Sequence, residues 1–260
     1  MYKSQHYTCS ASLVLFNNPP QMVMEALKSI PSSVQITIVD NSPQPDLGRI
    51  IVGSADLRYH HTGSNLGYGK GHNLGVALSP PAEYHLILNP DISCHPDTVD
   101  RLVTFIAQHP AIGLVGPRLI YPDGTPQYLN RRHPTVSDIV MRRFPAPLLT
   151  HKMRQRIHKH EMQDIGYDTT CDVDCISGAF MLCRRAAFEQ IGGFDERYFM
   201  YFEDVDLCCA LRKSGWRTVY YPAAVVTHHW KRASAKQLRL TFVHIQSMLY
   251  FFNKWGWKWR

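Results

Sequence analysis

The most constraining feature of the sequence is an alternation of short apolar runs with segments of helical spacing. The runs at 9–16, 34–39 and 84–88 are typical of buried strands, and helical patterns occupy 21–30 and 96–108. Further strands are expected at 57–61, 112–115, 176–185, 217–221 and 224–227. Strands that alternate with helices predict an α/β fold whose central, mostly parallel sheet is flanked by helices on both faces. At 260 residues the chain is long enough for one or two domains.

Polar residues stand where two of the predicted strands end. Asp40 and Asn41 follow the run at 34–39, and Asn89 and Asp91 follow the later run. In open sheets built from parallel strands, ligands bind at the carboxyl ends of the strands. We therefore expect these four side chains on one rim, although they are far apart in the sequence.

A glycine-rich stretch, GSNLGYGKGHNLG at 63–75, separates the third and fourth predicted strands. Its glycines allow the backbone to approach a ligand closely. The stretch contains neither GxGxxG nor GK[ST], which disfavours an NAD-dependent oxidoreductase and excludes a P-loop. Two interpretations remain open. It is either a flexible loop that leads into a helix, or a loop whose N–H groups, with Lys70, lie near a diphosphate.

The stretch FDERYFMYFEDVDLCC at 194–209 places carboxylates among large aromatic side chains. Its second half has helical spacing, so Glu203, Asp204 and Asp206 crowd a first helical turn, where backbone N–H groups stabilise negative charge. One interpretation is that these acids only begin a helix. The other is a catalytic site, because aromatic walls with acids at the rim suit a site where a hydroxyl loses a proton.

The rest of the second half carries weaker signals. Residues 117–130 are typical of a hairpin that turns at Pro122-Asp123-Gly124. Residues 131–165 are basic and rich in histidine, and predict helices and a mobile loop of the kind that often forms a substrate lid or docking surface. Ser177-Gly178 begins a predicted strand, and a small residue there lets another group come close. His228-His229 ends the last strand, and one of this pair is a candidate ligand.

The formal net charge of +7 and the isoelectric point of about 9.0 suit an anionic partner. That partner is a nucleoside diphosphate, acidic lipid headgroups or nucleic acid, and composition alone does not choose among them. The basic residues form no known nucleic-acid motif, and the acidic rim would repel phosphates unless a cation intervened. A non-catalytic basic protein that binds nucleic acid or anionic lipid stays as the alternative to an enzyme.

Several features bear on the cell compartment. No apolar run reaches the roughly 18–20 residues that span a bilayer, and NNPP follows the first apolar run, which predicts a strand rather than a signal peptide. Seven cysteines without a CxxC pair indicate neither a disulfide framework nor a zinc site, and fit a reducing cytoplasm. The tail at 236–260 combines helical spacing with NKWGWKWR, which suits either a membrane interface or a helix packed on the domain.

Taken in order, these segments resemble the motifs of glycosyltransferase family 2 over nearly the whole chain. VDNS at 39–42 resembles the family's VDNxS, the stretch at 63–75 its NxGxGxGxNxG, and LNPD at 88–91 a form of its DxD. The later segments SGA at 177–179, GGFDE at 192–196, EDVD at 203–206 and His228 are similar to SGA, GGFDE, EDxD and a late metal-ligand histidine. Each motif alone is weak, and their shared order is specific.

The resemblance implies an inverting, metal-dependent enzyme with the GT-A fold. It implies a single domain at 1–235, with a nucleotide-sugar-binding half at 1–116 and an acceptor and catalytic half at 117–235. The segment 236–260 would be a basic, aromatic, amphipathic helix.

Carried over by position, the resemblance assigns roles to individual residues. Asp204 would be the general base with Glu203 beside it, and His228 would complete a metal shell, with His229 as the fallback. The roles in binding would be divided as follows: the nucleotide-sugar on Asp40, Asn41, Asn65, Gly67, Lys70, Asn73, Asn89 and Asp91, the acceptor on Asp195 and Glu196, and Mg²⁺ or Mn²⁺ on Asp91 and His228. Asn89 departs from the family, since other members have an aspartate there and a neutral amide is a poorer cation ligand.

The LNPD form and the basic aromatic tail resemble bacterial rhamnosyltransferases, which use dTDP-L-rhamnose. This narrower resemblance implies a cytoplasmic enzyme that acts on a lipid-linked glycan acceptor in O-antigen or lipopolysaccharide synthesis, with peripheral membrane contact through 236–260. The same fold with a UDP- or GDP-sugar donor is the alternative within the family.

Overall fold

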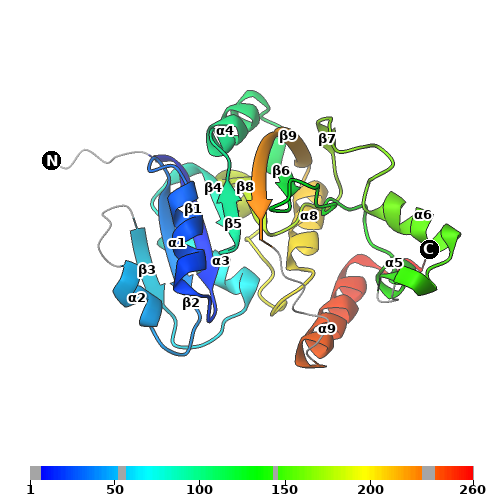
Figure 1. The fold of residues 1–260 in the computed structure, drawn as a ribbon, viewed down its shortest axis with the longest axis horizontal. Coiled ribbons are helices and arrows are strands. Elements are labelled where there is room, and N and C mark those ends of the chain that lie inside the picture. Colours follow the sequence, from blue (N-terminus) through cyan, green and yellow to red (C-terminus); the bar gives the residue numbers. More distant parts are fainter. Residues whose placement is uncertain (1–6, 52–56, 143–145, 230–237, 260) are drawn as a thin grey trace.

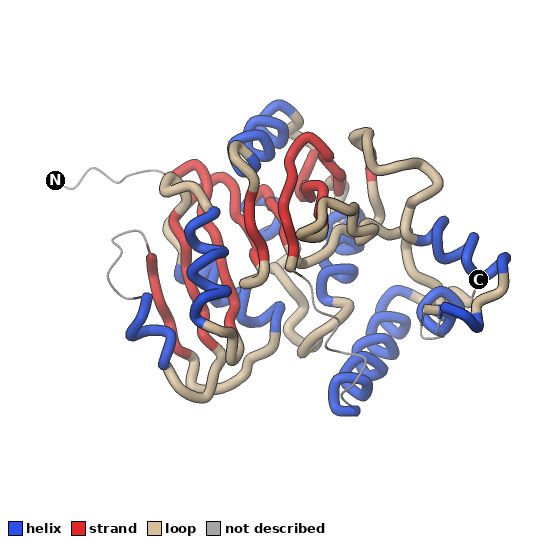
Figure 2. The backbone as a smooth tube through the Cα atoms, viewed as in Figure 1, coloured by secondary structure: helices blue, strands red, loops and turns tan. Residues whose placement is uncertain are grey.

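A single sheet organises the computed structural model, which describes residues 7–51, 57–142, 146–229 and 238–259. Figure 1 shows the sheet with helices on both sides, and Figure 2 shows the strands running through the centre of the molecule. The strands are β1 (Tyr7–Leu15), β2 (Gln35–Asp40), β3 (Leu57–His61), β4 (Ala82–Leu88), β5 (Ile92–Cys94), β6 (Ile112–Ile120), β7 (Cys171–Asp172), β8 (Phe180–Arg184) and β9 (Arg217–His228). The helices are α1 (Pro20–Ser29), α2 (Asp46–Ile51), α3 (Tyr68–Leu78), α4 (Thr98–Gln108), α5 (Val136–Met141), α6 (His151–His160), α7 (Arg185–Gln190), α8 (Glu203–Lys213) and α9 (Leu238–Trp255), with a 3-10 turn at Ala146–Leu148.

The strand order in the described sheet is β3-β2-β1-β4-β8-β6-β9-β5, with β7 paired to β9. Strands β3, β2, β1 and β4 are parallel neighbours, and so are β6 and β9. Strand β8 lies antiparallel between β4 and β6, and makes the sheet mixed. The predicted α/β fold with a central, mostly parallel sheet flanked by helices is confirmed.

The strand register brings the ends of β2 and β4 together. Leu15 at the end of β1 pairs with Asp40, and Leu13 pairs with Leu88 on the other side. Because all three strands run in the same direction, the segments that follow β2 and β4 leave the sheet at the same edge. The rim expected for Asp40 and the 89–91 segment therefore exists.

The core follows the two-residue period of the strands. On β4, Leu86 and Leu88 pack into one apolar cluster with α1 and α4, whereas Ile87 packs into a second cluster with α3, α7 and α8. A third cluster, around Phe251 and Phe252, joins α9 to α8. Among the described residues, every helix is too short or too polar to cross a bilayer.

The second half differs in detail from the sequence-based expectations. The two strands expected at 217–221 and 224–227 form the single strand β9, and its pairing with β6 shifts register beside Pro222, which lacks an N–H to donate. The expected hairpin at 117–130 has its turn, but the returning arm makes only one bridge, between Ile120 and Pro126. The division expected between 116 and 117 falls inside β6.

Two further expectations fall partly outside the described residues. Helices α5 and α6 occupy less than half of the basic segment 131–165, whose residues 143–145 are not described. The predicted tail helix is α9, and residues 236, 237 and 260 of that prediction also lie outside the described part. All seven cysteines are free.

Candidate active site at the carboxyl rim of the sheet

The rim holds a carboxylate and an imidazole that face each other. Asp91 begins the step from β4 to β5, and the pairing of β5 with β9 sets His228 beside it. The Oδ1 atom of Asp91 lies 3.4 Å from Nε2 of His228. Both side chains are largely buried, with 4% of the His228 side chain and 21% of the Asp91 side chain exposed. Their contact lowers the pKa of the Asp91 carboxyl, outweighing the burial that would raise it.

Gln127 fixes the orientation of this imidazole. Its amide nitrogen donates to the backbone oxygen of His228 at 2.8 Å, so its Oε1 is the atom that faces Nδ1, also at 2.8 Å. Because that oxygen can only accept, Nδ1 carries the hydrogen, and Nε2 points at Asp91. The two facing atoms therefore need either a proton on Nε2 or a cation between them. No pattern in the sequence predicts this role, since Gln127 lies in the segment expected to be a plain hairpin.

The chemistry of this pair fits a divalent cation. The Oδ1 atom of Asp91 is buried and accepts no hydrogen bond from the described residues. Carboxylate oxygen and imidazole nitrogen are both ligands that Mn²⁺ accepts. Within the described residues no cluster of three or more His, Cys, Asp or Glu side chains could hold a metal. A cation here would therefore take its remaining ligands from a bound molecule or from water.

The structure places the two adjacent histidines differently. His229 is exposed, its Nε2 lies 3.3 Å from Oγ of Ser93, and its N–H donates to the backbone oxygen of Asp91. His228, not the fallback His229, therefore faces the Asp91 carboxylate. The Asn89 N–H donates to Ala179, and this bond attaches the LNPD segment to the segment at 177–179.

The second acidic group sits on the first turn of α8. Tyr201 and Phe202, just before it, both have left-handed backbone conformations, with φ of 70° and 66°. Such conformations cost about 1–3 kcal/mol each and occur where a site needs a sharp change of direction. Here they turn the chain so that Glu203 and Asp204 enter the helix at the edge of the site.

Glu203 and Asp204 differ in their environments. Each Asp204 oxygen accepts a backbone N–H, one from Gly178 at 3.1 Å and one from Val205 at 2.8 Å. Glu203 is buried, and its Oε2 has no hydrogen-bond partner among the described residues. Burial, together with the neighbouring Asp204 charge, raises the pKa of Glu203 to about 8. At neutral pH the Glu203 carboxyl is therefore protonated.

The segment at 177–179 connects the two acidic groups. Gly178 donates to Asp204, and Ala179 accepts from Asn89. The hydroxyl of Tyr68, the first residue of α3, donates to the Gly178 oxygen, and a Cβ at Gly178 would lie 3.1 Å from that hydroxyl. The small residue thus admits a group, as predicted, and the group is Tyr68, whose role the sequence did not indicate.

The pKa of Tyr68 is affected by acids from both groups. Its pKa is raised well above the ordinary value, first by burial and then by the charges of Glu203, Asp204 and Asp91. Charges from two distant parts of the chain therefore act on one phenol.

Four of the predicted nucleotide-binding residues form hydrogen bonds within the fold. Asp40 is fully buried, and its two oxygens accept from the Ser42 N–H and the Tyr59 hydroxyl. The other three residues shape the turn into α3. Asn41 Nδ2 donates to the Gly67 oxygen at 3.1 Å, Thr62 Oγ1 donates to Asn41 Oδ1 at 3.0 Å, and the Gly67 N–H donates to Asn65 Oδ1 at 3.0 Å. Whether they also touch a ligand stays a prediction.

The glycine-rich stretch is mostly helix. Gly69, Gly71 and Gly75 lie inside α3 and are buried, so the loop that leads into the helix is confined to residues 63–67. A Cβ at Gly75 would lie 2.6 Å from Cβ of Ser12, which shows that the helix packs directly on β1. Gly67 precedes the helix with φ of +87°, and a Cβ there would lie 2.3 Å from the Phe199 oxygen. These glycines permit close packing of α3 against the sheet and against the acidic segment.

The predicted residues on α3 bond to the acidic segment at 194–196. Both polar atoms of the Asn73 amide bond the backbone of Phe194, with distances of 2.9 Å. Lys70 pairs with Glu196 at 3.3 Å, and both side chains are 47% exposed.

Asp195 already has cationic partners. It accepts from Arg197 and, at 2.8 Å, from Lys254 of α9. Burial alone would raise the pKa of this carboxyl, but these bonds outweigh it and lower the pKa to about 2. Its predicted contact with an acceptor would compete with these partners.

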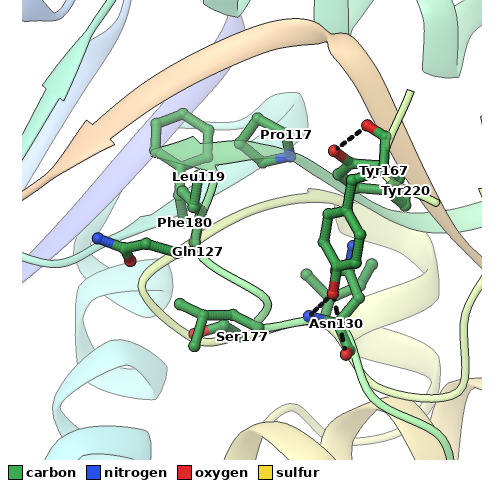
Figure 3. Close-up of a pocket in the computed structure, with 10 residues that line it drawn as sticks. Pro117, Leu119, Gln127, Asn130, Tyr167, Ser177, Phe180 and Tyr220 are labelled. Carbon is green, nitrogen blue, oxygen red and sulfur yellow. Dashed lines mark hydrogen bonds between the residues drawn. The ribbon is translucent and has the colours of Figure 1, made fainter. Parts of the chain in front are cut away.

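A pocket opens beside Gln127 and Ser177 (Figure 3). It encloses about 230 Å³ of empty space, part of it open to solvent. Its lining includes Gln127 from the imidazole contact and Ser177 from the connecting segment, and the other lining residues are Pro117, Leu119, Leu129, Asn130, Tyr167, Ile176, Phe180 and Tyr220. The Tyr167 hydroxyl accepts from the Asn130 N–H, which closes one wall.

Comparison with known proteins gives a consistent result. The sequence profile described as glycosyltransferase like family 2 matches residues 21–244. An N-acetylglucosaminyl-diphospho-decaprenol L-rhamnosyltransferase of Mycobacterium tuberculosis is 34% identical over 200 residues, which cover 73% of this chain and 63% of that protein. The rhamnosyltransferase WbbL of Escherichia coli K12 is 31% identical over 216 residues, which cover 80% of this chain and 77% of that protein. The chain thus spans less than two thirds of the length of the mycobacterial relative.

Solved structures share the fold at low identity. A mannosyltransferase of Pyrobaculum calidifontis, solved with GDP-Man and Mn²⁺, matches with a TM-score of 0.63 and 15% identity, over 96% of this chain and 64% of that one. GalNAc-T7, solved with UDP, GalNAc and Mn²⁺, matches with a TM-score of 0.65 and 15% identity, over 87% of this chain and 44% of that one. These matches identify the fold as GT-A.

Proposed function

Because the chain belongs to glycosyltransferase family 2, as its motifs predict, we propose that it is an inverting, metal-dependent rhamnosyltransferase. It would move L-rhamnose from dTDP-L-rhamnose to a hydroxyl of a lipid-linked glycan in the synthesis of a cell-surface polysaccharide, on the cytoplasmic side of the membrane. Two rhamnosyltransferases among its relatives support the sugar, and the name of one supports a lipid-linked acceptor. The observation that carries the proposal is that the segment at 177–179 bonds both Asn89, next to the Asp91–His228 pair, and Asp204, next to Glu203, and so links the two acidic groups.

The donor would lie along the rim between β2 and β4. Asp40, Asn41 and Asn65 support its nucleotide end, and α3, with Lys70 on its first turn, begins beside them. Asp91 and His228 would hold Mg²⁺ or Mn²⁺, which neutralises charge on a diphosphate when bound. Asn89 supplies no carboxylate, so the diphosphate oxygens would complete the ligand set.

The acceptor hydroxyl would meet the sugar beside Asp204. Its oxygen forms the new bond to the anomeric carbon, the bond from that carbon to the diphosphate oxygen breaks, and the electron pair leaves with the diphosphate. The proton of the hydroxyl passes to Asp204, whose orientation is fixed by the Gly178 and Val205 N–H groups. Glu203 is protonated at neutral pH and is therefore not the proton acceptor.

Donor binding is the direct test. Thermal shift of the wild type with dTDP-L-rhamnose, UDP-sugars and GDP-sugars, each with and without Mn²⁺, measures which ligand stabilises the folded state. We expect a Mn²⁺-dependent shift with dTDP-L-rhamnose, and loss of the Mn²⁺ dependence in Asp91→Ala. Conversion of the exposed Asp123 to Ala is the matched control.

The structural neighbours solved with UDP and with GDP-Man support a different donor as the second candidate. A shift with a UDP- or GDP-sugar alone would keep the glycosyltransferase and refute the donor. No shift with any sugar nucleotide would contradict the proposed function.

A further inference from the structure

Helix α9 presents an apolar stripe to solvent. Phe242, Ile245 and Leu249 have exposed fractions of 70%, 44% and 42%, and their spacing of three and four residues places them on one face. The opposite side of the helix is buried, since Phe251 is fully enclosed. The helix is therefore firmly seated on the domain while a second apolar face stays outside.

Two tryptophans extend this stripe. Trp257 is 41% exposed and Trp259 is 65% exposed. Their rings stack on each other with centroids 5.7 Å apart, and Trp257 stacks on Phe252 at 5.3 Å. The Lys258 oxygen accepts the N–H of Val136 at 2.8 Å, so the segment after α9 is held against the start of α5.

The neighbouring helices at this end are basic. Figure 1 shows α5, α6 and the end of α9 gathered at one end of the molecule. Helix α6 has the sequence HKMRQRIHKH, without an acid, and its Lys152, Arg154 and Lys159 are exposed. The acids near this helix are already paired, Asp138 with Arg156, Glu161 with Arg142 and Asp164 with Arg132. The residues 238–259 contain no Asp or Glu either.

We infer that this end of the molecule, the α9 stripe with Trp257, Trp259 and the basic face of α6, binds the surface of an anionic lipid bilayer. An apolar helix face with tryptophans and flanking cations matches the interfacial zone of a bilayer, where rings lie at the headgroups and cations meet anionic lipid. A second copy of the chain fits worse, because the same face of a partner would place basic surfaces together without acids to offset them.

Helix α9 is attached to α8 by hydrogen bonds to one buried carboxylate. Asp206 of α8 accepts from Lys254 Nζ at 2.8 Å and from Trp255 Nε1 at 2.7 Å, and Lys254 also bonds Asp195. The Asp206 side chain is only 3% exposed. Bilayer contact through α9 would therefore hold the first turn of α8, with Glu203 and Asp204, at a fixed orientation to the lipid surface.

Vesicle flotation tests the inference with the full chain. Neutral phosphatidylcholine vesicles are compared with vesicles that contain about one third phosphatidylglycerol, at low and high salt. We expect binding to the anionic vesicles that weakens with salt, because lipid charge contributes. The triple variant Phe242→Ser, Ile245→Ser, Leu249→Ser should bind about 10- to 100-fold more weakly.

Phe16→Ser is the matched control, because Phe16 is 46% exposed on the first half of the fold. Its binding should equal that of the wild type, and the triple variant should keep the wild-type thermal transition. Unchanged vesicle binding by the triple variant would overturn the inference. A second result would also overturn it: the wild type is a dimer in light scattering, the same substitutions dissociate that dimer, and neither protein binds vesicles. Sugar-nucleotide thermal shifts measured on the same variants separate this failure from failure of the proposed function.

Discussion

The raised pKa of Glu203 predicts that replacing this residue by glutamine stabilises the protein, and more so as pH rises. The folded protein holds the carboxyl protonated up to about pH 8, whereas the unfolded chain ionises it near 4.5. Between these values the unfolded state binds fewer protons than the folded state, so the free energy of unfolding falls as pH rises. Glutamine cannot ionise in either state, and it resembles the protonated carboxyl in shape.

The magnitude follows from the separation of the two pKa values. Each pH unit between 4.5 and 8 removes about 1.4 kcal/mol, so the wild type has lost about 3 kcal/mol at pH 7 and about 5 kcal/mol above pH 8. Below pH 4.5 the loss disappears. For a chain of this size about 3 kcal/mol corresponds to roughly 6 °C in the melting temperature.

The assay is urea unfolding of the wild type and Glu203→Gln at half-unit steps from pH 5 to pH 9. The difference between the two proteins, not either curve alone, isolates this one group from other titrating residues. Glu25→Gln, at an exposed position on α1, serves as the control and should change stability by less than about 0.5 kcal/mol at every pH. A stability difference that does not grow between pH 5 and pH 8 would refute the reasoning.

Three other perturbations test the remaining parts of the site. Gln127→Ala should weaken Mn²⁺ binding about 10- to 100-fold in a spin-resonance titration, because the imidazole loses its orienting partner, and unchanged affinity would remove Gln127 from the site. Asp204→Asn should lower the transfer rate about 10²- to 10⁴-fold in single-turnover assays and leave donor affinity intact, and near-normal transfer would exclude it as base. Lys254→Met should lower the free energy of unfolding by about 1–3 kcal/mol and speed hydrogen exchange in α9, since it leaves buried Asp206 without its cation. Equal exchange rates would contradict the attachment of α9 to α8 through Asp206.

The sequence was informative wherever a local pattern decides the structure. The apolar runs became β1, β2 and β4, and the polar residues after β2 and β4 share a rim because parallel strands must end at the same edge. The pairing of Asp91 with His228 was expected only from family resemblance. It depends on the antiparallel register of β5 with β9, which links residues far apart in the chain.

The residues that the sequence missed act through contacts set by tertiary packing. Gln127 reaches His228 because the arm after β6 folds back beside the end of β9, and the segment itself is typical of any turn. Tyr68 is aromatic and begins a helix, which would ordinarily mark it as core. The effect of the acids of α8 on its pKa depends on where α8 lies, and no spacing within α3 predicts that position.

The acidic segment shows why identical residue types diverge in role. Side chains two positions apart in a helix differ by about 200° in direction, so Asp204 and Asp206 point to opposite sides of α8. Asp204 faces the connecting segment at Gly178, whereas Asp206 faces α9 and bonds Lys254 and Trp255. Glu203, one step earlier, points into the protein and is kept neutral by burial. One short motif therefore supplies a candidate base, a protonated neighbour and an anchor for the tail helix. The direction in which each side chain leaves the helix determines the role of each acid.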